Sequence, residues 1–250
     1  MKLFAFIFIC VKSCSLLFML NGNPKPEQLN KASEFTGLMD NMRYLYDDKH
    51  VSETNIKSQE KFLQHDLLFK ISGSKILKTE FNNKSLSDKY KNKNVDLFGT
   101  NYYNQCYFSS DNMELNDGRL IEKTCMYGGV TEHDGNQLDE EKVIGVNVFK
   151  DGVQQEGFVI KTKKAKVTVQ ELDTKVRFKL ENLYKIYNKD TGNIQKGCIF
   201  FHSHNHQDQS FYYDLYNVKG SVGAEFFQFY SDNRTVSSSN YHIDVFLYKD

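Results

Sequence analysis

A single amphipathic helix, flanked by segments that favour β-structure, is the feature that most constrains the fold of this chain. Thr168 and Glu171 form a T-x-x-E capping box, which is typical of a helix N-terminus. Apolar residues then recur at spacings of 3, 4, 4 and 3 and define one face: Val169, Leu172, Val176, Leu180 and Leu183. This pattern predicts a helix that packs one side against a larger apolar surface.

The segments around this helix predict a sheet. Val143–Val148 and Phe158–Thr162 favour strands, and Asp151-Gly152 between them is a hairpin signal. After the helix, four more strands are predicted at Cys198–Phe201, Phe211–Tyr216, Phe226–Tyr230 and Tyr241–Tyr248. A hairpin, a long helix and then strands describe a helix lying across a mixed sheet, as in a β-grasp domain. We assign this domain to residues 137–250.

Residues 44–136 have a different pattern of short, aromatic-rich apolar runs that favour strands. The runs are Phe62-Leu63, Leu67–Phe69, Val95–Phe98, Tyr102–Phe108 and Cys125–Thr131, with a short helix predicted at Leu86–Lys91. About five short strands and one helix suit a small β-barrel of the oligonucleotide/oligosaccharide-binding (OB) type. The predicted fold class is therefore α+β, with this barrel first and the β-grasp domain second. Residues 23–43 are expected to form an N-terminal tail and helix.

Residues 1–22 have the shape of a secretory signal peptide. Lys2 precedes an apolar stretch that runs from Leu3 to Leu20, interrupted by Lys12, and no A-x-A cleavage site follows. A membrane anchor is the alternative, but the interrupted run is short for a bilayer. We expect a secreted, extracellular protein without membrane insertion.

The cysteines fit an exported protein. Cys10 and Cys14 lie in the leader, whereas Cys106 and Cys125 remain, 19 positions apart. An oxidising compartment would let these two pair and close a polar loop. Cys198 lies in a strand-like apolar run, where a buried small hydrophobe is favoured over a reactive thiol.

Charge and motifs argue against nucleic-acid binding and against catalysis. The chain has 32 basic and 32 acidic residues, and the basic run Lys161–Lys166 is short enough to be a solvated face. It has no nucleophile elbow, P-loop, dinucleotide fingerprint or Cys-x-x-Cys. The sequence therefore predicts a binding protein that is not an enzyme.

One group of residues indicates a metal. His242 and Asp244 alternate along the last predicted strand and so share one sheet face, opposite Ile243. His202, His204 and His206 follow at the end of another strand. Two imidazoles and a carboxylate suit zinc, and three protein ligands would leave a fourth position for water or for a partner group. On spacing alone, solvent-facing residues are the more common explanation of H-x-D.

Two longer motifs resemble a known family. Tyr127–Asn136 matches Y-G-G-[LIV]-T-x4-N, and Lys164–Asp173 with Arg177 and Leu180 matches a second signature that spans the predicted helix. Both are signatures of the staphylococcal and streptococcal pyrogenic-toxin superantigens, and the resemblance extends from Pro24 to Asp250. The first half is similar to enterotoxins B and C, and the last third to enterotoxins A and E.

The resemblance implies the barrel and β-grasp fold and a function in which no bond is made or broken. Such toxins cross-link class II major histocompatibility (MHC) molecules to the variable β region of the T-cell receptor and activate T cells without regard to antigen. The resemblance assigns Phe62 and Leu63 to an exposed loop that inserts against the class II α chain, with Glu80 and Tyr127 as polar neighbours. From the residues alone, Phe62 and Leu63 would be ordinary core.

The resemblance also implies zinc ligands at His202, His242 and Asp244, through which the class II β chain is bound, although His204 or His206 could replace His202. On the T-cell receptor side it implies Asn41, Tyr103 and Asn104. The expected state is a monomer or a zinc-linked dimer.

Two alternatives stay open. A superantigen-like immune-evasion protein would share both domains and bind complement, antibody or glycans, but such proteins generally lack the Cys-bounded loop and the zinc triplet. A secreted zinc hydrolase would need a general base, and none is evident near the predicted ligands.

Overall fold

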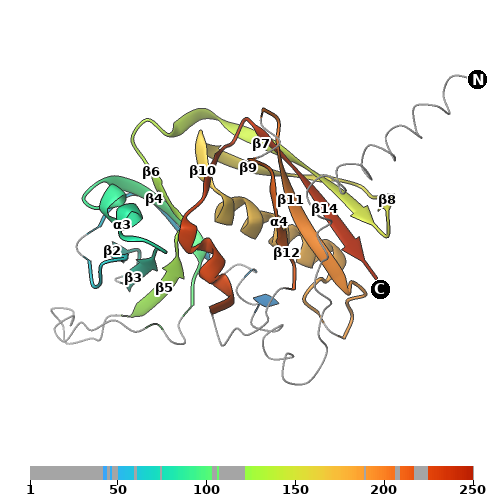
Figure 1. The fold of residues 1–250 in the computed structure, drawn as a ribbon, viewed down its shortest axis with the longest axis horizontal. Coiled ribbons are helices and arrows are strands. Elements are labelled where there is room, and N and C mark those ends of the chain that lie inside the picture. Colours follow the sequence, from blue (N-terminus) through green and yellow to red (C-terminus); the bar gives the residue numbers. More distant parts are fainter. Residues whose placement is uncertain are drawn as a thin grey trace, which may run out of the picture.

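The computed structural model describes residues 42–43, 46, 50–58, 61–73, 75–102, 106, 122–188, 190–205, 209–216 and 225–249. Figure 1 shows two domains side by side, the barrel strands with α3 at one end and the long strands β7, β11 and β14 with α4 at the other. The predicted α+β class, with an OB-type barrel followed by a β-grasp domain, is confirmed.

The barrel domain consists of two three-stranded sheets with the strand orders β1-β4-β6 and β2-β3-β5. Its elements are β1 (His50–Lys57), β2 (Asp66–Ile71), β3 (Lys75–Glu80), α3 (Lys84–Tyr90), β4 (Asn94–Thr100), β5 (Lys123–Tyr127) and β6 (Val130–Glu132). Leu67, Phe69, Leu77 and Leu97 are almost completely buried in its core. Helix α3 starts after Asn83, whose side chain accepts a hydrogen bond from the Leu86 amide.

The β-grasp domain is a sheet with the strand order β12-β11-β14-β7-β8, with β9 also paired to β7. Its strands are β7 (Gln137–Lys150), β8 (Val153–Gln154), β9 (Phe158–Lys164), β11 (Lys196–Ser203), β12 (Phe211–Asp214) and β14 (Tyr241–Tyr248). The predicted hairpin turn joins β7 to β8, with φ of 50° at Asp151 and 78° at Gly152. Both values lie in the left-handed region, as a two-residue hairpin with primed turn geometry requires.

Helix α4 (Val169–Tyr184) packs against this sheet through Val169, Leu172, Val176 and Leu180, all buried. The Thr168 hydroxyl accepts a hydrogen bond from the Glu171 amide, which confirms the predicted N-cap. Thr168 also ends β10 (Lys166–Thr168), which pairs with β13 (Thr235–Ser237) after the 3₁₀ helix η2 (Glu225–Asp232).

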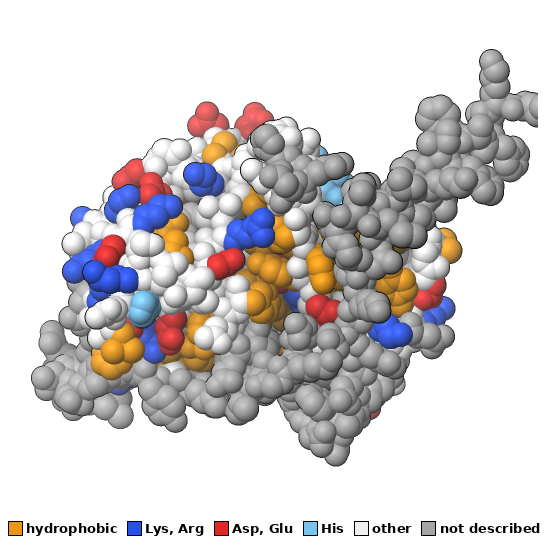
Figure 2. All heavy atoms as spheres, in the orientation of Figure 1, with side chains coloured by type: hydrophobic (Ala, Val, Ile, Leu, Met, Phe, Trp, Pro, Cys, Tyr) orange, Lys and Arg blue, Asp and Glu red, His pale blue; other side chains and the backbone are white. Residues whose placement is uncertain are grey.

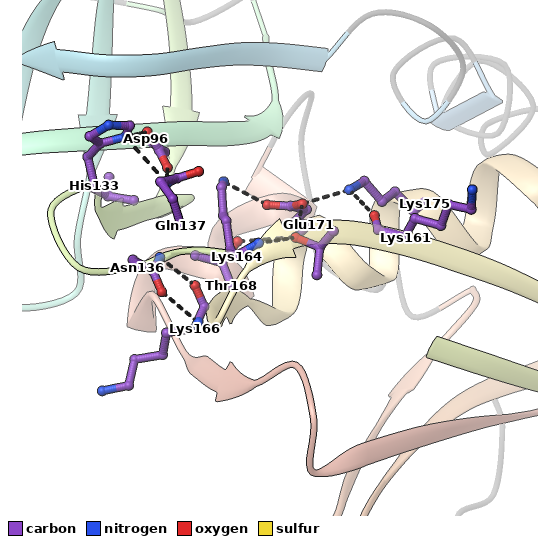
Figure 3. Close-up of polar contacts among 12 residues, drawn as sticks. Asp96, His133, Asn136, Gln137, Lys161, Lys164, Lys166, Thr168, Glu171 and Lys175 are labelled. Atoms are coloured by element: carbon purple, nitrogen blue, oxygen red, sulfur yellow. Dashed lines mark hydrogen bonds and ion pairs between the residues drawn. The ribbon is translucent and has the colours of Figure 1, made fainter. Parts of the chain in front are cut away.

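The two family signatures contact each other at the junction of the domains. Figure 3 shows the side chain of Asn136, the last residue of the first signature, bonded to Lys166 in the second: its Oδ1 accepts from the Lys166 amide and its Nδ2 donates to the Lys166 carbonyl. Gly128, with φ of 54°, lies against η2, and a Cβ there would be 2.2 Å from the Tyr230 carbonyl oxygen. Residues of the two signatures thus form contacts at the junction of the domains as well as the helix α4.

Several sequence expectations are wrong. Phe226–Tyr230, predicted as a strand, belongs to the 3₁₀ helix η2, which packs against β5. Leu183 is 60% exposed and does not join the buried face of α4. The capping box predicts that the Glu171 carboxylate accepts a hydrogen bond from the Thr168 amide. The carboxylate instead binds the side chains of Lys164 and Lys175.

The barrel expectations also need correction. Phe62-Leu63 is a bend before β2 and not a strand. Tyr102 forms a single bridge to Cys125, and most of the strand expected at Tyr102–Phe108 lies outside the described residues. Strands β1 and β3 were not predicted as elements.

Candidate metal centre and docking surfaces

The candidate metal centre lies on two antiparallel strands of the β-grasp sheet. β11 and β14 pair in a register that sets His202 opposite His242 and Phe200 opposite Asp244. Because side chains alternate along a strand, His242 and Asp244 face outward while Ile243 and Val245 are completely buried on the other face. The alternation expected from the sequence is confirmed.

The three predicted ligands converge. Among the described residues, His202, His242 and Asp244 are the one group whose ligand atoms all lie within 4.8 Å of one another. His202 Nε2 is 3.1 Å from Asp244 Oδ2, and the rings of His202 and His242 stack with centroids 4.7 Å apart. His202 Nε2 is buried and makes no well-aligned hydrogen bond, so this nitrogen is available to bind a ligand such as a metal ion.

Electrostatics favour the zinc-binding forms of Asp244 and His242. Burial raises the pKa of Asp244, but contacts with His202 and Asn147 outweigh it and hold the pKa below its ordinary value. Burial lowers the pKa of His242, and although Asp244 opposes this, His202 and His204 add to it. A carboxylate and neutral imidazoles are the protonation states that zinc requires. The donor set therefore fits zinc, which His202, His242 and Asp244 would hold.

Two further residues lie next to this centre: Asn147, which the sequence did not identify, and His204, which the sequence offered only as an alternative ligand. Asn147 on β7 donates from Nδ2 to Asp244 Oδ1 over 2.8 Å, and it lies beside Asp244 in the parallel pairing of β7 with β14. His204 Nε2 lies 2.9 Å from His242 Nδ1. His204 is thus beside His242 and is not in the converging group, which contains His202, whereas His206 lies outside the described residues.

A second candidate surface is the loop before β2. Phe62 is 36% exposed and Leu63 is 60% exposed, so neither is ordinary core. The amides of both residues donate to Asp66 Oδ1 at 2.8 Å, and this buried carboxylate fixes the bend with the side chains outward. Figure 2 shows hydrophobic side chains beside a histidine and acidic groups over this end of the barrel.

The polar residues predicted for this surface lie next to the loop. Glu80 and Tyr127 are opposite each other in the parallel pairing of β3 with β5. Leu63, Glu80 and Tyr127 line one hollow of about 340 Å³, which η2 closes with Gln228 and Ser231. Lys78 binds Glu80 at 2.7 Å and so fixes its carboxylate at the rim.

The third set of predicted residues cannot be placed, because Asn41, Tyr103 and Asn104 lie outside the described residues. The predicted disulfide between Cys106 and Cys125 is present. Cys198 is buried, and burial raises the pKa of its thiol to about 12, as expected for an unreactive side chain. In the described part of the chain, no helix has the length and apolar character needed to cross a membrane.

Comparison with protein families identifies both domains. Residues 41–132 match the model of the staphylococcal/streptococcal toxin OB-fold domain, and residues 144–247 match that of the corresponding β-grasp domain. Enterotoxin type C-3 of Staphylococcus aureus is 40% identical over 98% of this chain and 94% of its own length. Enterotoxin type A of the same species is 39% identical over 92% of this chain and 91% of its own.

Solved structures similar to this chain belong to the same family of toxins. Staphylococcal enterotoxin SEN is 62% identical, with a TM-score of 0.78 over 88% of this chain and 98% of its own. Enterotoxin A co-crystallised with zinc is 38% identical, with a TM-score of 0.78 over 89% of this chain and 99% of its own. The superantigen SpeA, in a complex with a T-cell receptor β chain and soaked with zinc, is 34% identical. Its TM-score is 0.79 over 92% of this chain and 99% of its own. A further structure of that exotoxin describes a zinc-binding site with implications for MHC class II recognition.

Proposed function

Since the chain belongs to the staphylococcal and streptococcal toxin family, we propose that it is a superantigen toxin that cross-links MHC class II molecules and the variable β region of the T-cell receptor. The single observation that carries this function beyond family membership is the convergence of His202, His242 and Asp244 on the exposed side of the β-grasp sheet. Relatives of this fold are solved with zinc and with a T-cell receptor β chain.

His202, His242 and Asp244 would hold the zinc. The bound metal would supply a Lewis acid able to accept a donor group from the class II β chain, and would in that way join the two proteins. The chain's own part is to present the three donors on rigid strands, with Asn147 holding the Asp244 carboxylate.

The class II α chain is bound by the loop that carries Phe62 and Leu63. An exposed aromatic and aliphatic pair beside a polar hollow is a common arrangement for an interface anchor. Glu80 and Tyr127 at the rim supply the polar contacts that orient the partner. The two class II surfaces lie on different domains, so they are independent sites.

The remaining assignments follow from the family. Asn41, Tyr103 and Asn104 contact the T-cell receptor, residues 1–22 direct secretion, and the mature protein acts outside the cell. It works by binding and has no catalytic residue. The domains extend over residues 44–136 and 137–250, after a tail and helix at 23–43.

The test is class II binding by the purified protein with and without EDTA, together with Asp244→Ala. We expect chelation and the substitution each to lower affinity by a large factor, and added zinc to restore wild type only. Asp139→Ala, which removes an exposed carboxylate from β7, is the control and should bind as wild type does. Binding that is insensitive to both treatments would overturn the zinc bridge, and no binding at all would favour an immune-evasion protein.

A further inference from the structure

His204 is held beside His242 by the backbone as well as by its ring. Its amide donates to the Asn240 carbonyl over 2.8 Å, just beyond the last pair of β11 with β14. Its ring lies edge to edge with that of His242, with centroids 5.1 Å apart and planes 20° apart. In this arrangement His204 Nε2 lies 2.9 Å from His242 Nδ1, a hydrogen-bond distance.

We propose that His204 is a positioning residue of the zinc centre, an inference that rests on the zinc site proposed above: its Nε2 accepts a hydrogen bond from Nδ1–H of His242 and leaves His242 Nε2 for the metal. A neutral imidazole carries one proton, so a proton fixed on Nδ1 puts the free lone pair on Nε2. Metal-binding histidines generally donate their second N–H to an acceptor, which fixes the tautomer and the ring orientation.

The geometry favours this role over direct ligation. Zinc–nitrogen bonds are about 2.0–2.1 Å long, so the ligand atoms of one tetrahedral site lie close together. His204 is not in the described group whose ligand atoms lie within 4.8 Å of one another. Its Nε2 meets the nitrogen of His242 that would otherwise compete for the metal. His204 as a ligand would have to give up that hydrogen bond.

The centre then has an outer support on each side. Asn147 from β7 holds one oxygen of Asp244, which directs the other oxygen toward His202. His204, from the end of β11, does the same for His242. Both supports act through another side chain, so each should change zinc affinity without changing which residues bind the metal.

The experiment measures zinc affinity by competition with a chelating fluorophore, and the absorption spectrum of the cobalt-substituted protein, for wild type and five variants, one of which is the Asp244→Ala variant introduced above. We expect His204→Ala to weaken zinc binding about 10–100-fold, with one metal per chain and unchanged cobalt bands. His204→Gln, whose amide oxygen can accept from Nδ1–H, should recover most of the affinity. Asn205→Ala, an exposed neighbour, should match wild type, and His202→Ala should lose the cobalt spectrum of the intact site.

A readout without metal addresses the tautomer itself. Long-range proton–nitrogen correlation spectra of the apo protein should show His242 protonated on Nδ1, and this preference should weaken in His204→Ala. Wild-type zinc affinity in His204→Ala, or a cobalt spectrum altered as in His202→Ala, would overturn the inference. If wild type itself takes up no zinc, the proposed zinc site fails and the inference fails with it. If Asp244→Ala abolishes zinc binding but His204→Ala leaves it intact, the inference about His204 fails while the proposed zinc site stands.

Discussion

At the residue scale, Phe62 and Leu63 show how one buried carboxylate can make two apolar side chains available to a partner. Asp66 accepts both loop amides, so the bend is stable without burying the side chains. Leu63, which is 60% exposed, can therefore be truncated at little cost to folding, whereas truncating Phe62, which is 36% exposed, also removes packing.

We predict that Phe62→Ala and Leu63→Ala each weaken class II binding measured in EDTA, where the zinc bridge is absent, by at least about 30-fold, the loss typical of an interface hot spot. Zinc affinity should stay at the wild-type value, because the metal centre is on the other domain. Val153→Ala removes an apolar side chain from β8 whose exposure is similar to that of Leu63, and is the matched control for Leu63→Ala. Equal losses of α-chain and zinc binding would point to a folding defect.

Glu171 is the residue for which pH dependence is best defined. Figure 3 shows its carboxylate between Lys164 and Lys175, at 2.8 Å and 2.6 Å. Burial acts to raise the pKa of Glu171, but the two lysines outweigh it and the pKa lies below its ordinary value. A depressed pKa means that ionised Glu171 stabilises the fold above the unfolded-state pKa of about 4.3, and that this stabilisation disappears as pH falls through the folded-state pKa.

We therefore predict that Glu171→Gln lowers the free energy of unfolding by about 2–4 kcal/mol at pH 7, because two lysines lose a buried partner. The gap between wild type and variant should be constant from about pH 6 to 8 and should narrow below about pH 4. Urea unfolding across this range measures it. Glu141→Gln, which breaks the exposed pair with Lys161, should change little. A gap that widens in acid would contradict the assignment.

The sequence predicted the inner ligands but not their supports. Alternation along one strand is local, so it placed His242 and Asp244 on one face. Asn147 and Asp66 depend on which residues of distant segments come together, and that is set by strand register and loop closure. His202 was selected over His204 through the family resemblance, because three histidines at two-residue spacing are equivalent by alternation alone.

At the element scale, local signals explain which elements were predicted. The α4 helix has a cap and a 3.6-residue period, and the β7–β8 turn has an Asp-Gly pair, so both followed from sequence. η2 has an aromatic-rich stretch that resembles a strand, and only packing against β5 decides its helical form. β1 was missed because Val51 and Ile56 are its only aliphatic residues and the rest are polar or charged.

The disulfide ties β5 to a long connection. Cys106 and Cys125 are 19 residues apart, and closing a loop of this length contributes roughly 3 kcal/mol by restricting the unfolded chain. We predict that Cys106→Ser lowers the melting temperature by roughly 6–12 °C in calorimetry. Wild type with reductant should show the same loss, and zinc affinity should not change. An unchanged melting temperature would show that the bond does not stabilise the fold.

At the scale of the whole molecule, the two proposed class II surfaces are on different domains, so the rigidity of the junction determines how they are spaced. Asn233 is the central polar residue of this junction. Its Oδ1 accepts from the Val130 amide over 2.8 Å, and its Nδ2 donates to the Val130 carbonyl over 2.9 Å and to the Tyr90 hydroxyl over 3.2 Å. Its own backbone, with φ of 47°, adopts the left-handed conformation that asparagine tolerates.

We predict that Asn233→Ala lowers the free energy of unfolding by about 2–4 kcal/mol, because both backbone groups of Val130 lose a partner in a buried site. Since the lost bonds join the domains, the calorimetric transition should also broaden or divide into two. Asn193→Ala, at an exposed turn with a single long hydrogen bond to Lys150, is the control and should keep the wild-type transition. Zinc affinity should survive in both variants, because the metal strands are intact. A loss of stability with an undivided transition of wild-type width would show that Asn233 stabilises one domain and does not couple the two, and the spacing of the class II surfaces would then depend on Gly128 and Asn136.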